Sequence, residues 1–208
     1  MIDDAEFERL YGPWESLGPD GAARLMADFP GVWWVVGGWA IEAFTGVRRE
    51  HEDIDVVIFR RDLPAFLELV RGRYDVWSAG AGAIRPVNED WPEPHADAGQ
   101  VWLREHARAP WVLDCLLNED RDGRWVSRRE EWSVPLEEVT WVAADGIRYM
   151  RPEVVLQHKA LQDRPKDRAD LAAALPRLSP EQRAWLRDGV FRVYGAEHPW
   201  AALVDGSS

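Results

Sequence analysis

The chain has 208 residues, which is enough for one ordinary domain or for one domain with a small helical appendage. Its composition, with 46% hydrophobic and 30% charged residues, is that of a soluble globular protein. The formal net charge of -12 would repel a phosphate backbone, and it therefore disfavours a dedicated DNA or RNA binder.

Membrane-spanning and secreted classes are disfavoured as well. The sequence holds no apolar run of about eighteen residues, the length that crosses a bilayer. The N-terminus is acidic and polar, whereas a secretory signal needs a basic start and an apolar stretch, so we expect a cytoplasmic protein. The single cysteine, Cys115, excludes an internal disulfide and a cysteine-rich zinc site, and it is expected to be a small buried side chain.

Apolar spacing and turn residues predict alternating helices and strands in the first half of the chain. The β-prone run VWWVV predicts a buried strand, and the two glycines that follow it end that strand and open a helix. In chain order, the expected elements are a helical stretch at 4–28 divided near 18–21, a strand at 32–36, a helix at 39–46, a charged loop and strand at 48–59, and a helix at 62–70.

The second half changes from strands to helices. Residues 78–100 are rich in Gly, Pro, Ala and acids, which predicts a loop with one short strand. Prolines at 165 and 180 divide the helical part. The remaining expected elements are strands at 100–104 and 111–117, a hairpin of 139–143 and 147–150, and helices at 152–162, 166–178 and 180–194.

This pattern predicts an α+β protein with a small mixed sheet, flanking helices and a C-terminal helical subdomain. We expect residues 1–150 to form a catalytic core and residues 151–208 to form the helical subdomain.

The most informative acids lie at the start of the second strand. Alternate side chains of a strand share a face, so His51, Asp53 and Asp55 are expected to point the same way, and Glu52 away from them. Two carboxylates on one face repel each other unless a cation lies between them, and magnesium prefers such oxygen ligands. The alternative is a pair of solvated acids on an exposed strand edge. His51 could orient Asp53 or be merely structural.

A third acid, Asp114, lies inside the apolar run WVLDCLL. A buried carboxylate without a partner is unfavourable. A metal held by Asp53 and Asp55 on a neighbouring strand would supply that partner, and an arginine is the alternative.

A strand, two glycines and a helix form an arrangement that suits phosphate binding. Gly37 and Gly38 allow close approach of the backbone, and the N-terminus of the helix offers unpaired N–H groups to an anion. Without the acids that follow, the same two glycines would indicate only a tight turn.

Two motifs, GGWAIE at residues 37–42 and HEDID at residues 51–55, carry a resemblance to a known family. They resemble the signature of the DNA polymerase β-type nucleotidyltransferases, and more closely that of the aminoglycoside 2''-nucleotidyltransferase and lincosamide nucleotidyltransferase branch. Lys159 and the segment 164–171 are similar to the later part of such enzymes. The resemblance is strong over residues 32–60 and loose over 111–171.

The resemblance implies roles for individual residues. Asp53 and Asp55 would hold magnesium, in one or two ions, and Asp114 would bind a second ion or act as the base for the acceptor hydroxyl. Gly37, Gly38, Trp39 and Lys159 would bind the nucleotide.

The function implied is magnesium-dependent transfer of a nucleoside monophosphate from a nucleoside triphosphate, ATP, to a hydroxyl of a small acceptor. An aminoglycoside-like antibiotic is the expected acceptor, pyrophosphate is the by-product, and neither nucleic acid nor membrane is an expected partner. Three alternatives remain: a toxin or phage-defence nucleotidyltransferase acting on RNA or protein, a non-catalytic nucleotide-binding module, and a metal-dependent hydrolase.

Overall fold

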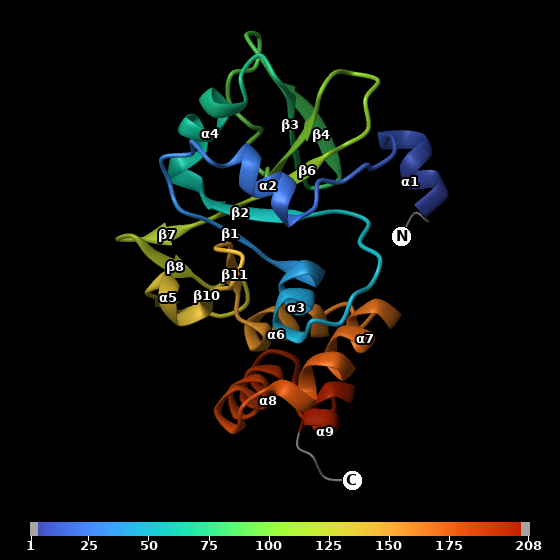
Figure 1. The fold of residues 1–208 in the computed structure, drawn as a ribbon, viewed down its shortest axis with the longest axis vertical. Coiled ribbons are helices and arrows are strands. Elements are labelled where there is room, and N and C mark those ends of the chain that lie inside the picture. The colour runs from blue at the N-terminus through green and yellow to red at the C-terminus, as the bar shows by residue number, and fades with distance from the viewer. Residues whose placement is uncertain (1–3, 205–208) are drawn as a thin grey trace. The chain divides into compact units, whose positions relative to one another are not determined.

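The computed structural model describes residues 4–204, and residues 1–3 and 205–208 lie outside that range. The chain divides into two compact units, each of which is discontinuous in sequence (Figure 1). Unit 1 comprises Met1–Val35 and His51–Asp120, and unit 2 comprises Val36–Glu50 and Arg121–Ser208. Both contain helices and strands, which confirms the predicted α+β class. The division into functional domains at residues 150 and 151 remains a prediction.

Unit 1 contains a mixed sheet with the strand order β1-β2-β6-β5-β3-β4. The pair β2–β6 is parallel, and the other neighbouring pairs of this unit are antiparallel. In chain order its elements are α1 (Asp4–Tyr11), α2 (Pro19–Leu25), β1 (Trp33–Val35), β2 (Asp55–Phe59), the 3-10 helix η1 (Arg60–Asp62), α4 (Leu63–Val70), β3 (Asp75–Gly80), β4 (Ala83–Val87), β5 (Gln100–Arg104) and β6 (Leu113–Asn118).

The parallel pair β2–β6 forms the centre of the core of unit 1. A parallel pair covered on both faces needs nearly continuous apolar sequence, and DVVIF and LDCLLN supply it. Cys115 is fully buried, as expected, and burial together with the neighbouring Asp114 raises the pKa of its thiol well above the ordinary value. Phe29, after α2, packs edge to face on Phe66 of α4, with the ring centroids 6.2 Å apart.

The hairpin of β3 and β4 corrects the prediction for residues 78–100, which expected a loop with one short strand. The turn consists of Ala81 and Gly82, both with positive φ (49° and 77°), as two-residue hairpin turns require. The sequence did not predict the hairpin because alanine is unusual in such a turn and proline is unusual within a strand. Pro86 is tolerated here because β4 is the last strand in the order.

Unit 2 is mainly helical, with α3 packed on α6 and α7, α6 on α7 and α8, and α8 on α9 (Figure 1). The hairpin of β10 and β11 lies where it was predicted. The elements of this part are α3 (Gly37–Thr45), β7 (Asp120–Arg121) at the boundary, β8 (Arg124–Val126), β9 (Ser133–Val134), α5 (Leu136–Val139), β10 (Thr140–Val142), β11 (Arg148–Met150), α6 (Pro152–Ala160), α7 (Pro165–Ala174), the 3-10 helix η2 (Leu175–Arg177), α8 (Pro180–Tyr194) and α9 (Pro199–Val204).

Helix α8 shows how local sequence sets a helix start. The Ser179 hydroxyl accepts a hydrogen bond from the Gln182 amide (3.2 Å), and the Gln182 side chain accepts one from the Ser179 amide (3.0 Å). This capping box satisfies N–H groups that a helix start would otherwise leave unbonded, and Pro180 in the first turn has no N–H that would need a partner. Between residues 4 and 204, none of the helices is both long and apolar enough to cross a membrane.

Candidate active site

Two of the three predicted acids lie side by side in the sheet of unit 1. Asp55 opens β2 and is the direct partner of Asp114 in the parallel neighbour β6. The Asp114 amide donates a hydrogen bond to the Ile54 carbonyl (3.1 Å). Neighbouring strands lie about 4.8 Å apart, and directly paired residues project from the same face. The structure thus brings the carboxyl groups of Asp55 and Asp114 to one edge of one face.

Asp53 lies just outside the strand. β2 begins at Asp55, so the expectation that His51, Asp53 and Asp55 alternate along one strand is wrong. The cause lies in the neighbours: the pairing of β1 with β2 ends at Val35 opposite Val56, and nothing in β1 extends the ladder further back. The irregular segment 51–54 leaves Asp53 partly exposed, two residues from the Asp55–Asp114 pair.

The same face continues from the acids into an aromatic cluster. Asp114 is paired with Trp102 of β5, and Trp102 is paired with Trp77 of β3, so Asp55, Asp114, Trp102 and Trp77 form one row across four strands. Trp102 is 9% exposed, and its ring centroid lies 5.4 Å from that of Trp111. The sequence pattern predicted this strand but not the role of Trp102, because only the register shows that it borders Asp114.

Arg104 belongs to the aromatic cluster as well. Its guanidinium lies over the Trp77 ring (4.5 Å) and over the Trp111 ring (4.3 Å). Burial lowers the pKa of Arg104, and the nearby Asp75 acts in the opposite direction. These cation–π contacts help to keep a partly buried charge within the cluster.

The three acids are suitable ligands for magnesium, because proteins bind Mg²⁺ through carboxylate oxygens. Asp114 is 6% exposed, and a nearby cation would offset the burial of its charge. Among the residues that the structure describes, no group of three or more His, Cys, Asp or Glu side chains is already arranged to hold a metal.

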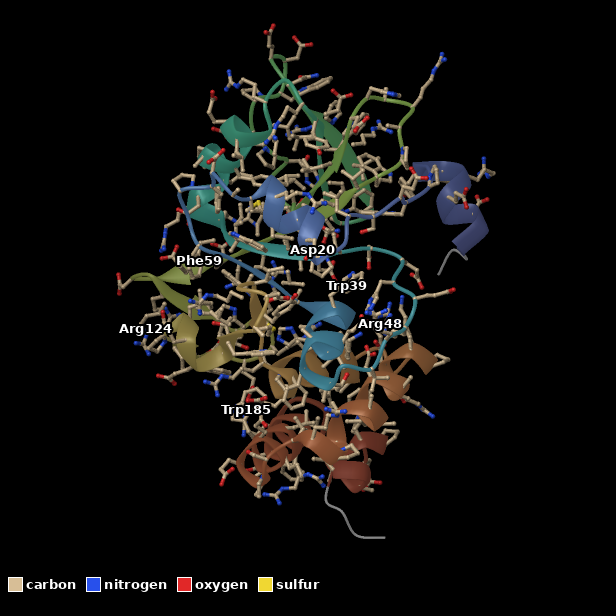
Figure 2. All side chains as sticks on the ribbon, in the orientation of Figure 1. Asp20, Trp39, Arg48, Phe59, Arg124 and Trp185 are labelled. Carbon is tan, nitrogen blue, oxygen red and sulfur yellow. The ribbon has the colours of Figure 1, made fainter. Side chains whose placement is uncertain are left out.

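The predicted nucleotide-binding residues belong to unit 2. Gly37 begins α3 with a φ of 68°, a conformation that glycine adopts at little cost. Figure 2 labels Trp39 in the first turn of this helix and Arg48 in the segment that follows the helix. The amide groups of this first turn are the donors that a phosphate would use.

Lys159 lies in a network of charges within unit 2. Its ammonium lies 2.9 Å from Asp167 and 3.0 Å from Asp170, and the side chain is 10% exposed. Arg49 donates to Asp170 (2.8 Å), which joins the segment after α3 to α7. Burial acts to raise the pKa of Asp167, but hydrogen bonds from Arg164 and Lys159 outweigh it and hold that pKa below its ordinary value. Contact of Lys159 with a triphosphate stays a prediction.

A titratable residue that the sequence did not single out is His158 in α6. Burial, together with the positive charges of Arg129 and Arg128, lowers the pKa of His158 to about 4. Between pH 6.5 and pH 4 the unfolded chain therefore binds a proton that the folded protein does not, so stability falls as the pH falls through this range.

We expect His158→Gln to lose less stability than the wild type when the pH falls from 7 to 4. The difference should approach about 3 kcal/mol, from 1.36 kcal/mol per pKa unit. Denaturant unfolding of the wild type and of His158→Gln at several pH values measures this difference in stability. Parallel curves of stability against pH would contradict the assignment.

One family of known proteins matches part of the chain. Residues 23–75 match the family model of the aminoglycoside-2''-adenylyltransferases, a range that contains Gly37, Gly38, Asp53 and Asp55. No curated protein sequence is similar enough to count as a match.

Two solved structures share the fold. The solution structure of the antibiotic-resistance factor ANT(2'')-Ia has a TM-score of 0.51 and 21% identity, with 83% of this chain and 89% of that chain covered. The lincomycin-bound crystal structure of the lincosamide antibiotic adenylyltransferase LnuA has a TM-score of 0.50 and 15% identity, with 83% and 96% covered.

These findings confirm the predicted resemblance to the nucleotidyltransferase superfamily. The match of residues 23–75 confirms the predicted resemblance to the aminoglycoside-2''-adenylyltransferases, which are enzymes, and the two solved structures confirm the fold.

Proposed function

We propose that this protein transfers an adenylyl group from ATP to a hydroxyl of a small acceptor, with Mg²⁺ as cofactor and pyrophosphate as by-product. The observation that carries the proposal is the pairing of Asp55 with Asp114 on neighbouring parallel strands. The match of residues 23–75 to an adenylyltransferase family supports it, because that segment contributes Asp53 and Asp55.

The proposed reaction makes one bond and breaks one. The acceptor oxygen forms a bond to the α-phosphorus, and the bond from that phosphorus to the oxygen bridging to the β-phosphorus breaks. The electron pair leaves with pyrophosphate, and a carboxylate takes the proton of the hydroxyl. Asp114 serves as this base or as a ligand of a second metal ion.

Asp53 and Asp55 are the proposed ligands of Mg²⁺, which supplies neutralisation of the phosphate charge. The aromatic row that begins at Trp102 limits the access of water to one side of the acids. A carboxylate in such surroundings interacts more strongly with nearby charges than one in open water.

We assign nucleotide binding to Gly37, Gly38, Trp39 and Lys159. The N–H groups at the start of α3 suit the phosphates, and Trp39 offers an aromatic surface in the same turn. The Lys159 ammonium already has two carboxylate partners, so its effect on phosphate binding is expected to be smaller than that of the glycines.

An aminoglycoside is the proposed acceptor, because the matching family is that of aminoglycoside-2''-adenylyltransferases. The net charge of -12 favours encounter with a polycation. The lincomycin-bound relative makes a lincosamide the second candidate.

Release of pyrophosphate from each ribonucleoside triphosphate tests the proposal, with Mg²⁺ present and a panel of aminoglycosides and lincosamides as acceptors. We expect release with ATP that depends on an aminoglycoside. Absence of acceptor-dependent release would overturn the small-acceptor proposal. Labelled nucleotide appearing in RNA or protein would instead support the toxin or phage-defence alternative.

A further inference from the structure

Unit 2 contains a pocket of about 760 Å³ to which the proposed reaction assigns no role. Its walls come from residues 130–134, α5, the start of α6 and α8. Its lining includes two tryptophans, Trp132 and Trp185, and a nearly buried acid, Glu153.

The aromatic wall is held in place before any ligand binds. Trp132 and Trp185 meet edge to face, with ring centroids 6.2 Å apart and ring planes at 71°. The Trp132 indole donates a hydrogen bond to Glu130 (3.2 Å), which also accepts one from Arg192 (2.8 Å) and one from Gln157 (2.8 Å). Figure 2 labels Trp185 on α8. A wall fixed in this way loses little conformational freedom when a ligand packs on it.

The carboxylates leave the pocket negative. Glu130 is paired with Arg192, so three acids remain in the lining, Glu138, Glu153 and Glu181, with only Arg151 as a further cation. Glu138 and Glu181 are exposed, whereas Glu153 is 6% exposed. The electric field of the pocket therefore attracts a positive charge toward Glu153.

Glu153 is the unusual member of this set. It accepts a hydrogen bond from the neutral amide of Gln182 (2.7 Å), and no ion pair of Glu153 occurs in the described part of the chain. Burial raises the pKa of Glu153, although hydrogen bonds and the charge of Arg151 act against this. A buried carboxylate that lacks a paired cation lowers stability, and a cationic ligand would remove that penalty.

We propose that this pocket binds an organic amine, with the ammonium group against Glu153 and the carbon framework against Trp132 and Trp185. A carboxylate offers charge-assisted hydrogen bonds, and the face of a tryptophan attracts a cation. Linear polyamines and amino sugars share this chemistry. The proposal stands whether or not the protein transfers nucleotides, because every residue it uses lies in unit 2.

Calorimetric titration of the full chain with spermidine and with tobramycin tests the proposal. We expect at least one of them to bind. Glu153→Gln and Trp185→Ala should each weaken the binding about ten-fold, whereas Glu197→Gln, which removes an equal charge from an exposed loop, should leave it nearly unchanged. Glutamine at 153 keeps the shape and an acceptor for Gln182, so its melting temperature should not fall.

Each outcome has a defined meaning. If Glu153→Gln weakens the binding of spermidine but not of tobramycin, the pocket is assigned to linear polyamines. If it weakens the binding of tobramycin, the pocket is assigned to amino sugars. Wild-type protein that binds neither amine, or Glu153→Gln that binds both as tightly as the wild type, overturns the proposal. Asp55→Asn leaves every residue of the pocket in place and should keep spermidine binding, so failure of the proposed reaction is recognised separately, by the absence of pyrophosphate release.

Discussion

Asp55→Asn is expected to lower acceptor-dependent pyrophosphate release by two to three orders of magnitude, about the loss seen when a charge-stabilising group leaves an active site. Asparagine keeps the shape and the position opposite Asp114 but removes a negative charge from the proposed metal site. The remaining activity should need a higher Mg²⁺ concentration. Initial rates measured over a range of Mg²⁺ concentrations, at saturating ATP and acceptor, show both effects.

Glu52→Gln is the matched control for this variant. Glu52 lies three residues before Asp55, and its side chain is exposed. The same loss of one charge at this position should change the rate less than two-fold, an effect of general electrostatics only. Equal losses in Asp55→Asn and Glu52→Gln would show that Asp55 has no special role.

Asp167→Ala is expected to lower the free energy of unfolding by about 3 to 5 kcal/mol, the usual loss when one partner of a buried ion pair is removed. Asp167 is fully buried and accepts hydrogen bonds from the Lys159 ammonium (2.9 Å) and the Arg164 guanidinium (2.8 Å). Alanine would leave Lys159, which is 10% exposed, paired with Asp170 at 3.0 Å but without its contact to Asp167. Urea unfolding monitored by circular dichroism measures the change.

Asp188→Ala provides the comparison within the same unit. Asp188 pairs with Arg187, and the side chains of Asp188 and Arg187 are 53% and 45% exposed. Exposed pairs contribute about 0 to 1 kcal/mol, so this variant should unfold almost like the wild type. If Asp167→Ala and Asp188→Ala lowered the free energy of unfolding equally, burial would not explain the contribution of the Lys159 network to stability.

Local sequence predicted the elements whose signals are local. A strand is found within the apolar run at 32–36, and α7 and α8 each begin at a proline of the sequence. The sequence also led us to expect that Asp114 lies on a strand next to Asp55, and the order β2–β6 confirms it.

Long-range features were beyond the sequence. The row from Asp55 to Trp77 depends on the register of four strands, and a shift of one residue would turn each side chain to the other face. The start of β2 at Asp55, rather than earlier, follows from the short length of β1. Trp132 and Trp185 are separated by more than fifty positions in the sequence, and only tertiary packing brings their rings together.

The hairpin strand β4 has a consequence for encounters between copies of the protein. It ends the strand order of unit 1, where unpaired backbone groups would allow a second chain to add a strand. Pro86 lies within this strand and has no N–H to donate. Arg85, the middle residue of the strand, adds a charge and donates a hydrogen bond to the Glu93 carbonyl (2.8 Å). A continuous intermolecular ladder is therefore interrupted at this edge, which protects the sheet against edge-to-edge aggregation.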